Sequence, residues 1–399
     1  MLILTLPAAR GEPLRTDINP ALLYYQAFLV GVDVPQADRD FLFTNDWRGQ
    51  KLPKRFGEIV AGYDRQFKLV REAAQQKVPC DWGIDLSRGP ETYLPHLARA
   101  KAVAQVAQLR TMWDLQQGNQ IGARDDLLAA FVLARNVSRD GILISAVVQD
   151  ANEAIIYATV AGNFGQFSPD TLKQLTVGFD AAPAQRTAAM SIPTEKASIT
   201  DWLLRKIQEL QKANPGDDIK VMAGLREILS DADGDTNFWP QVVATSAGTS
   251  KGVIKLLQET EPLYARLAAV MTLPQPEYEV RAAQFSAENH KSQNPFVAEF
   301  VLGWERARGR EFRIQAELAM VHAAVEYKLH GEAGLKSVQD PFGNGPFAIE
   351  RFVFEGVDRG FELNSAYNFG GVPCGMIFVE KEGPPFSVSS PNIGKAVQP

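Results

Sequence analysis

The stretch GEAGLKSVQDPFGNGP, residues 331–346, separates two sequence patterns and thereby decides the fold class. Before it, apolar residues recur at the three- and four-residue spacing of amphipathic helices. After it, short runs rich in β-branched and aromatic residues alternate with glycines, which is typical of strands and turns. We therefore predict a mainly α protein, an α-array of irregular stacked helical hairpins with a small C-terminal antiparallel β meander.

The helical domain is predicted to cover residues 19–335, after an N-terminal tail at residues 1–18. A capping side chain followed by proline marks helix starts, because proline fills the first helical position without wasting a backbone N–H. Three such pairs are present: Asn19-Pro20, Ser168-Pro169 and Asn294-Pro295. Residues 91–137 are expected to form a helical hairpin that turns at Gly118. Its sequence does not recur at a spacing near 34 residues, so the array is irregular.

The last long helix is predicted over residues 310–330, because Gly331 suits the position just after a helix. Apolar residues lie on two of its faces, so we expect it to be buried between the helical domain and the tail. Residues 336–383 form the predicted β subdomain, followed by a flexible tail at residues 384–399. Its strands are expected near residues 347–354, 360–366 and 375–380.

Charge and hydropathy argue against nucleic-acid binding and against an internal membrane-spanning helix. The formal net charge is −6, from 41 Lys and Arg and 47 Asp and Glu residues, without a block of like charges. Because nucleic-acid binders present a basic face, we predict no nucleic-acid partner. The most apolar internal run, residues 141–148, is far short of the roughly 20 residues that a membrane-spanning helix needs.

Residues 1–10, MLILTLPAAR, resemble the last part of a secretory signal, with a short apolar stretch before small residues. A periplasmic or otherwise exported protein is therefore predicted, with a cytoplasmic protein as the alternative. Cys80 and Cys374 each follow a Val-Pro pair. In an exported protein we expect them to form a disulfide that ties the tail to the helical domain. The alternative is two unrelated free thiols.

The loop at residues 78–90 combines charged, aromatic and glycine residues, as ligand-binding loops often do. Its ligand-binding candidates, with one residue just beyond it, are Asp81, Trp82, Asp85, Arg88 and His96. The alternative is a structural loop whose Trp82 fills the core with its indole N–H bonded to a neighbour. Cys80 and His96 would be a minimal nucleophile and base, but no sequence signature supports that pair, and no catalytic residue is predicted.

One motif has the spacing of calcium ligands. Its oxygen-bearing side chains, at alternate positions, are Asp231, Asp233, Asp235 and Asn237. Hard oxygen ligands at this spacing can surround Ca²⁺. Thr236 and Val242 stand where such a loop normally has glycine and a bidentate glutamate, and the alternative is a solvated acidic turn. Calcium is the one cofactor that the sequence suggests.

Acid–base chemistry has little support in the sequence. His322 lies on an apolar helix face with Leu318 and Val325, so we expect a hydrogen-bonded core histidine. A catalytic carboxylate pair would need one member whose pKa is strongly raised in a desolvated cleft. We find no Asp or Glu within an apolar run that would produce one.

The C-terminal third carries a resemblance to a known family. A long helix, a glycine, the turn at residues 340–344, the hairpin with residues 360–365 and a Gly-Gly pair at 370–371 follow one another. Residues 310–371 resemble the C-terminal part of type II secretion pseudopilins, which implies a turn ahead of a small sheet. The pilin helix, the prepilin cleavage site and the Tyr-Pro before the turn are missing. The helical domain is similar to uncharacterised, mostly helical bacterial exported proteins, which imply no activity.

Function is predicted from architecture alone. Stacked helices commonly leave a concave surface that binds proteins or peptides. We predict a non-enzymatic binding or scaffold protein of the cell envelope, with a protein or peptide partner. The alternatives are a hydrolase with a pocket between the helical domain and the β tail, and a calcium-stabilised structural module.

Overall fold

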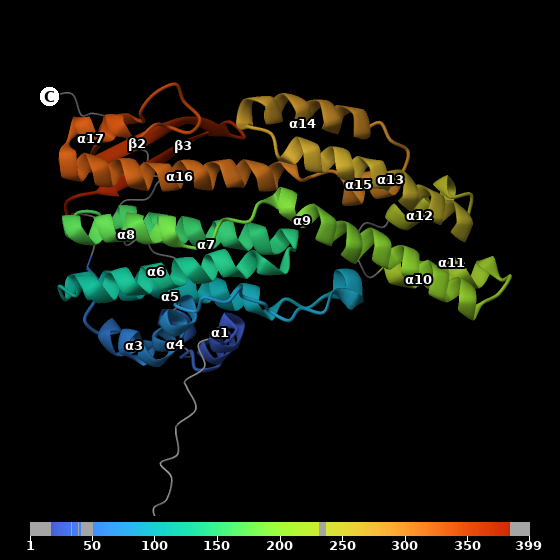
Figure 1. Ribbon diagram of the computed structural model, residues 1–399, viewed down its shortest axis with the longest axis horizontal. Coiled ribbons are helices and arrows are strands. Elements are labelled where there is room, and N and C mark those ends of the chain that lie inside the picture. Colours follow the sequence, from blue (N-terminus) through green and yellow to red (C-terminus); the bar gives the residue numbers. More distant parts are fainter. Residues whose placement is uncertain (1–16, 33, 39, 41–50, 231–236, 384–399) are drawn as a thin grey trace, which may run out of the picture.

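The computed structural model describes residues 17–32, 34–38, 40, 51–230 and 237–383 (Figure 1). This part of the chain is mainly helical and ends in a three-stranded antiparallel sheet, which confirms the predicted fold class. The N-terminal helices are α1 (Pro20–Leu29), α3 (Phe56–Gly62), α4 (Asp64–Ala74), η1 (Leu86–Glu91), α5 (Pro95–Gln116), α6 (Gln120–Val137), η2 (Ser138–Asp140), α7 (Leu143–Gly162) and α8 (Pro169–Ala181). None of the described helices is long and apolar enough to cross a membrane.

The remaining elements form an arm, a long central helix and the sheet. They are α9 (Ala188–Glu195), the π-helical η3 (Lys196–Asp201), α10 (Trp202–Ala213), α11 (Asp218–Ser230), α12 (Phe238–Thr245), α13 (Ser250–Met271), α14 (Gln275–Asn289), α15 (Pro295–Phe300), α16 (Glu305–His330), α17 (Glu332–Ser337), β1 (Ala348–Phe354), β2 (Val357–Phe369) and β3 (Val372–Val379).

The main body is a stack of helical layers (Figure 1). Helices α1, α3 and α4 cover one side of the α5–α6 hairpin, α7 and α8 cover the other, and α16 lies on α7 and α8. The hairpin has nearly the predicted bounds, and Asn119 caps α6 by accepting the Gly122 N–H. At the centre of the stack the Phe131 ring lies 4.7 Å from that of Phe179 and 5.9 Å from that of Tyr157. The apolar stripes read from the sequence meet in this core.

Helix α16 is buried on both sides, as predicted. One side packs on α7 and α8, and the other packs on β2 and β3. The Phe361 ring lies 5.0 Å from that of Tyr327 on α16 and 5.2 Å from that of Phe378 on β3. In the sheet, whose strand order is β1-β2-β3, Phe361 and Phe378 are register partners. The sheet therefore completes the core of the helical stack.

The Asp340-Pro341-Phe342-Gly343 turn has a structural role. The buried Asp340 carboxylate accepts hydrogen bonds from the Phe342 N–H, the Ser365 hydroxyl and the Ala366 N–H. Ser365 and Ala366 lie where the β2–β3 register shifts, between Asn364 and Asn368. The carboxylate thus satisfies backbone groups that the irregular ladder leaves open.

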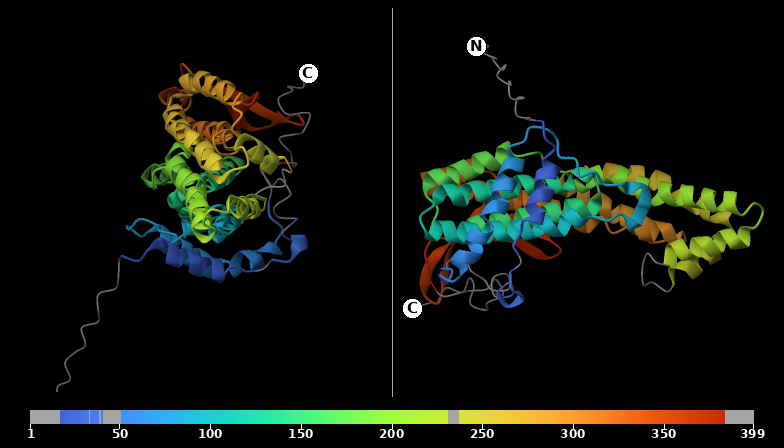
Figure 2. Two further views of the ribbon diagram at one scale, coloured as in Figure 1. Left: turned by 90° about the vertical axis from the view of Figure 1, so that its right-hand side faces the viewer. Right: turned by 90° about the horizontal axis from the view of Figure 1, so that it is seen from below.

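Helices α10 to α13 project from the body as an arm with its own core (Figure 1, Figure 2). That core consists of Leu203, Ile207, Val221, Met222, Leu225, Leu229, Val242, Val253, Leu256, Leu257 and Phe296. Helix α13 joins the two cores, because its later residues Tyr264 and Leu267 belong to the body. The α9–η3–α10 helix makes the second connection. The described part of the predicted helical domain therefore contains the body core, the arm core and a third, small cluster of Leu52, Phe56, Val60, Leu109 and Met112.

Candidate ligand-binding groove

The loop predicted to bind a ligand is a structural loop around Trp82. This side chain is 4% exposed, and its indole N–H donates to the Asn136 carbonyl at 2.7 Å. Its ring stacks on His96, with ring centroids 4.5 Å apart, and on Tyr24 at 5.7 Å. The alternative reading of this loop, with Trp82 filling the core, is the one that the structure bears out.

The remaining candidates of the loop lie on its outer side. The exposed Asp81 carboxylate accepts the Gly83 N–H, and the exposed Asp85 carboxylate accepts the Ser87 N–H. The Asp85 bonds lower the pKa of that carboxyl. The Arg88 guanidinium is exposed and lies 4.0 Å from Glu91. These side chains therefore do not converge on a pocket with Trp82.

His96 faces a carboxylate inside the core. Its Nε2 lies 3.2 Å from Asp140 Oδ2, and both side chains are almost wholly buried. The same oxygen accepts the Ser145 hydroxyl at 2.7 Å. Cys80 lines a surface groove that His96 does not reach, and burial raises the pKa of its thiol to about 12. The two residues are thus not arranged as a nucleophile and its base.

The predicted Cys80–Cys374 disulfide is not present, and both cysteines are buried free thiols. Cys80 follows α4 and lies near the start of α1, whereas Cys374 is on β3, close to Arg313 and Glu317 of α16. The α5–α6, α7–α8 and α16 layers separate these two places (Figure 1). Each cysteine follows a Val-Pro pair, but this local similarity says nothing about the distance between the two thiols in the fold.

The calcium prediction falls mostly outside the described residues. Asp231, Asp233 and Asp235 are not described, and Asn237 is the residue before α12. Among the described residues no group of three or more His, Cys, Asp or Glu side chains could hold a metal ion. Calcium binding by this turn therefore stays a prediction.

The expectation that no carboxyl has a strongly raised pKa is wrong. Burial, reinforced by neighbouring carboxyls, raises the pKa of Asp150 from 3.8 to about 8. Burial also raises that of Glu153 from 4.5 to about 7. Both residues are on α7, directly after the most apolar run of the chain. Glu153 Oε1 lies 2.7 Å from Nε of the buried Arg135, and Tyr157 donates its hydroxyl to Oε2 at 3.1 Å.

This buried polar cluster holds the connector between α8 and α9, residues 182–187. Asp150 Oδ1 accepts the Gln185 amide at 3.0 Å, and Gln149 Oε1 accepts the Arg186 N–H at 3.4 Å. At the start of α9, the Ala188 N–H donates to Glu311 of α16. The cluster is a structural support, because these carboxyls are almost fully buried and line none of the cavities described here.

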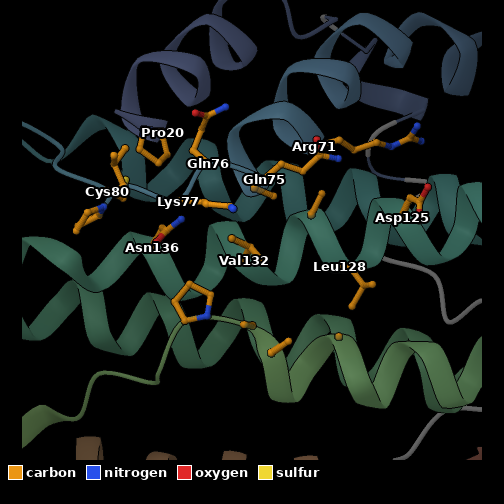
Figure 3. Close-up of a pocket in the computed structure, with 18 of the residues that line it drawn as sticks. Pro20, Arg71, Gln75, Gln76, Lys77, Cys80, Asp125, Leu128, Val132 and Asn136 are labelled. Carbon is orange, nitrogen blue, oxygen red and sulfur yellow. The ribbon is translucent and has the colours of Figure 1, made fainter. Parts of the chain in front are cut away.

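The best candidate for a binding site is a groove of about 780 Å³ between α4, α6 and α8, hereafter the α4–α6–α8 groove (Figure 3). Its lining residues are Pro20, Arg71, Ala74, Gln75, Gln76, Lys77, Val78, Pro79, Cys80, Arg124, Asp125, Leu128, Ala129, Val132, Asn136, Arg139, Gly178, Ala181, Ala182 and Pro183. Sequence reasoning found only Cys80 among them, because the lining comes from α1, α4, α6, η2, α8 and two connecting segments that are distant in sequence.

The floor of the groove is apolar and depends on a close helix contact. Leu128 of α6 lies against Gly178 of α8, where an added Cβ would come within 2.4 Å of the leucine side chain. Glycine therefore lets α8 approach α6 closely. Val132 and Ala182 continue the apolar lining toward Cys80.

The rim of the groove is cationic, and two of its four described cations are paired. Arg71 donates to the buried Asp126 at 2.6 Å, and Arg124 pairs with Asp125 at 2.6 Å. Two cations lack such a partner. Lys77 is exposed and pairs with no described carboxylate, and Arg139 Nε is buried without a hydrogen-bond partner among the described residues. A buried donor without an acceptor is costly, so this end of the groove favours an anionic group.

Two further cavities lie on the helical body. One of about 440 Å³ adjoins the groove, shares Arg71 and Asp125 with it, and is bounded by α3, α4, α5 and the start of α6. The other, of about 800 Å³, is bounded by α14, α15 and the start of α16. None of the three cavities is lined by a strand residue, so they do not support the predicted pocket between body and tail.

No protein-family model, curated protein or solved structure matches this chain. The resemblance of residues 310–371 to pseudopilins accordingly stays a prediction. Function has to be argued from the geometry of the α4–α6–α8 groove.

Proposed function

We propose that this protein is a non-catalytic binding protein whose ligand is a short extended peptide segment in the α4–α6–α8 groove. The groove itself is the observation that carries the proposal. Its volume of about 780 Å³ falls in the range of small-ligand sites, roughly 300–1,000 Å³. Its lining side chains come from helices that lie side by side, so a ligand chain in the groove would contact α4, α6 and α8 together (Figure 3).

The lining suits a peptide better than a purely apolar ligand. Gln75 and Gln76 bring side-chain amides, which can both donate to and accept from a peptide backbone. In the same lining, Val132 and Ala182 offer apolar contact for ligand side chains. Amides beside an apolar floor meet the two needs of an extended chain, backbone hydrogen bonds and side-chain burial.

The chemistry of the lining favours binding over catalysis. The Cys80 thiol has a pKa of about 12 and is a poor nucleophile at neutral pH. The one carboxylate among the described lining residues, Asp125, accepts two hydrogen bonds from Arg124, at 2.8 and 2.6 Å. A hydrolase would need a nucleophile, or a water, beside an available base.

A groove-filling substitution tests the proposal. Val132→Trp should fill the floor, and Val177→Trp, at a position on α8 that is 60% exposed, is the matched control. Each protein is equilibrated with a mixed-sequence library of acetylated hexapeptides, made as free acids and as C-terminal amides. Retained peptides are identified by mass spectrometry after dialysis.

We expect the wild type and Val177→Trp to retain the same subset of peptides at millimolar concentration, and Val132→Trp to lose that subset while keeping its helical circular dichroism. Retention of no peptide by the wild type, or equal retention by Val132→Trp, would contradict the proposal.

A further inference from the structure

We infer that the group recognised in the α4–α6–α8 groove is the free carboxylate at a peptide's C-terminus, bound by Lys77 and Arg139 at the Cys80 end. The inference rests on the proposed function and adds the ligand's chemistry and its direction in the groove. Its support is the charge complementarity between a carboxylate and the two unpaired cations at this end.

The charges of the groove are unbalanced at one end only. At the other end, Arg71 is neutralised by Asp126 and Arg124 by Asp125. At the Cys80 end, neither Lys77 nor Arg139 forms an ion pair with a described carboxylate, and the buried Arg139 Nε has no hydrogen-bond partner in the part of the chain that the structure describes. Lys77 extends over α6 near Val132 and Asn136 (Figure 3). One carboxylate would give both cations an anionic acceptor.

The Cys80 end of the groove borders the aromatic core of the body. Asn136, a lining residue, binds two buried aromatic side chains, with its amide 3.3 Å from the Tyr24 hydroxyl and its carbonyl 2.7 Å from the Trp82 indole nitrogen. Among the groups of a peptide, the one that suits two cations is the C-terminal carboxylate, so a peptide that ends here places that group beside Lys77 and Arg139.

The ligand should therefore lie with its C-terminus at Cys80 and its earlier residues toward Arg124. The amides of Gln75 and Gln76 lie along this path and can bond to its backbone. A fatty acid offers the same carboxylate but uses no amide partners, so the lining favours a peptide.

The test compares the free-acid and amide forms of the library peptides by calorimetry. The wild type should bind the free acid of its tightest peptide at least about tenfold more tightly than the amide, a modest gain for a partly exposed charge pair. Lys77→Met and Arg139→Gln should each reduce this ratio. Lys212→Met and Arg99→Gln, at exposed positions on α10 and α5, should leave it unchanged. The ratio should also fall as salt is added.

The possible outcomes distinguish a failure of carboxylate recognition from a failure of peptide binding. If acid and amide bind equally and Val132→Trp removes both, the groove binds peptides but carboxylate recognition is refuted. If octanoate binds as tightly as the tightest peptide and Lys77→Met weakens it equally, the ligand is a fatty carboxylate and the peptide assignment is refuted. If no peptide in either form binds, the proposed function fails with the inference.

Discussion

At the scale of single residues, the helical body depends on polar side chains in its core. Glu153 and Asp126 are 0% exposed, and each lies within 2.7 Å of an arginine nitrogen. Asp126 binds both Arg71 and Arg110, which fixes α4 and α5 on α6. Breaking a buried pair of this kind usually costs more than the pair contributes, because one charge is left without a partner.

The buried carboxyls of α7 should make stability depend on pH. In the folded protein the pKa values of Asp150 and Glu153 are about 8 and about 7, against 3.8 and 4.5 for the free groups. Between about pH 4 and pH 8 the folded protein therefore binds more protons than the unfolded chain, so stability falls as the pH rises through that window.

Asp150→Asn should flatten this dependence. The variant cannot ionise, yet it keeps an oxygen that can accept the Gln185 amide. We expect its free energy of unfolding to fall by about 4 kcal/mol less than that of the wild type between pH 5 and pH 8. Urea denaturation across the pH range measures this difference, with the exposed Asp170→Asn as the control. Parallel curves for wild type and Asp150→Asn would show that Asp150 is ionised throughout.

Substitution of Trp82 should lower the free energy of unfolding. Trp82→Phe keeps an aromatic ring but leaves the Asn136 carbonyl without the indole N–H, so we expect a loss of about 2 kcal/mol. The exposed Tyr93→Phe should cost almost nothing. Thermal denaturation compares the two variants, and equal melting temperatures would exclude a structural role for the indole bond.

At the scale of elements, the loop at residues 78–90, for which ligand binding was predicted, supports the arm. Its first part is fixed in the body by Trp82, and its last part, η1, contacts the start of α10. The Trp202 indole N–H donates to the Ser87 carbonyl at 2.9 Å, and Gly89 lies against the Trp202 ring. The loop therefore connects the body core to the base of the arm.

Gly89→Ala should loosen that connection. Gly89 has φ 63° and ψ −132°, a conformation almost restricted to glycine, and an added Cβ would lie 2.4 Å from the Trp202 ring. We expect a loss of about 3 kcal/mol and faster proteolysis within the arm. Gly118→Ala is the control, because Gly118 has φ 77° but open space around its Cβ position, and it should cost about 1 kcal/mol. Similar losses in the two variants would mean that the Trp202 contact contributes nothing.

At the scale of the whole molecule, the sheet and the helical stack share one core through α16. Phe164, two residues after the end of α7, packs on both Phe361 and Phe378 of the sheet. Lys328 of α16 donates to the Phe164 and Phe167 carbonyls, which caps the end of the α7 region. The sheet should therefore unfold together with the body.

Removing every residue after Gly331 should expose one side of α16 to water. At about 25 cal/mol per Å² of apolar surface, the loss should be several kcal/mol. Phe361→Ala tests the same contact more gently, with an expected loss of about 4 kcal/mol, and Val357→Ala, at a position that is 47% exposed, is its control. Calorimetry should show one transition of body and sheet moving to lower temperature. An unchanged melting temperature after truncation would mean that the sheet is an independent unit.

The sequence by itself determined the local structure of this protein. Asn19-Pro20, Ser168-Pro169 and Asn294-Pro295 begin α1, α8 and α15 as predicted, because a capping bond involves neighbouring residues only. The strands near residues 347–380 and the two-sided burial of α16 were also predictable, since apolar periodicity records which faces are buried.

Only the tertiary structure decided where polar residues meet. Asp150 follows an apolar run in the sequence, but its raised pKa depends on Glu153, on Glu311 of a distant helix and on burial by several layers. The separation of Cys80 from Cys374 and the α4–α6–α8 groove depend likewise on how distant helices stack. Such contacts join residues far apart in the chain, and no local pattern records them.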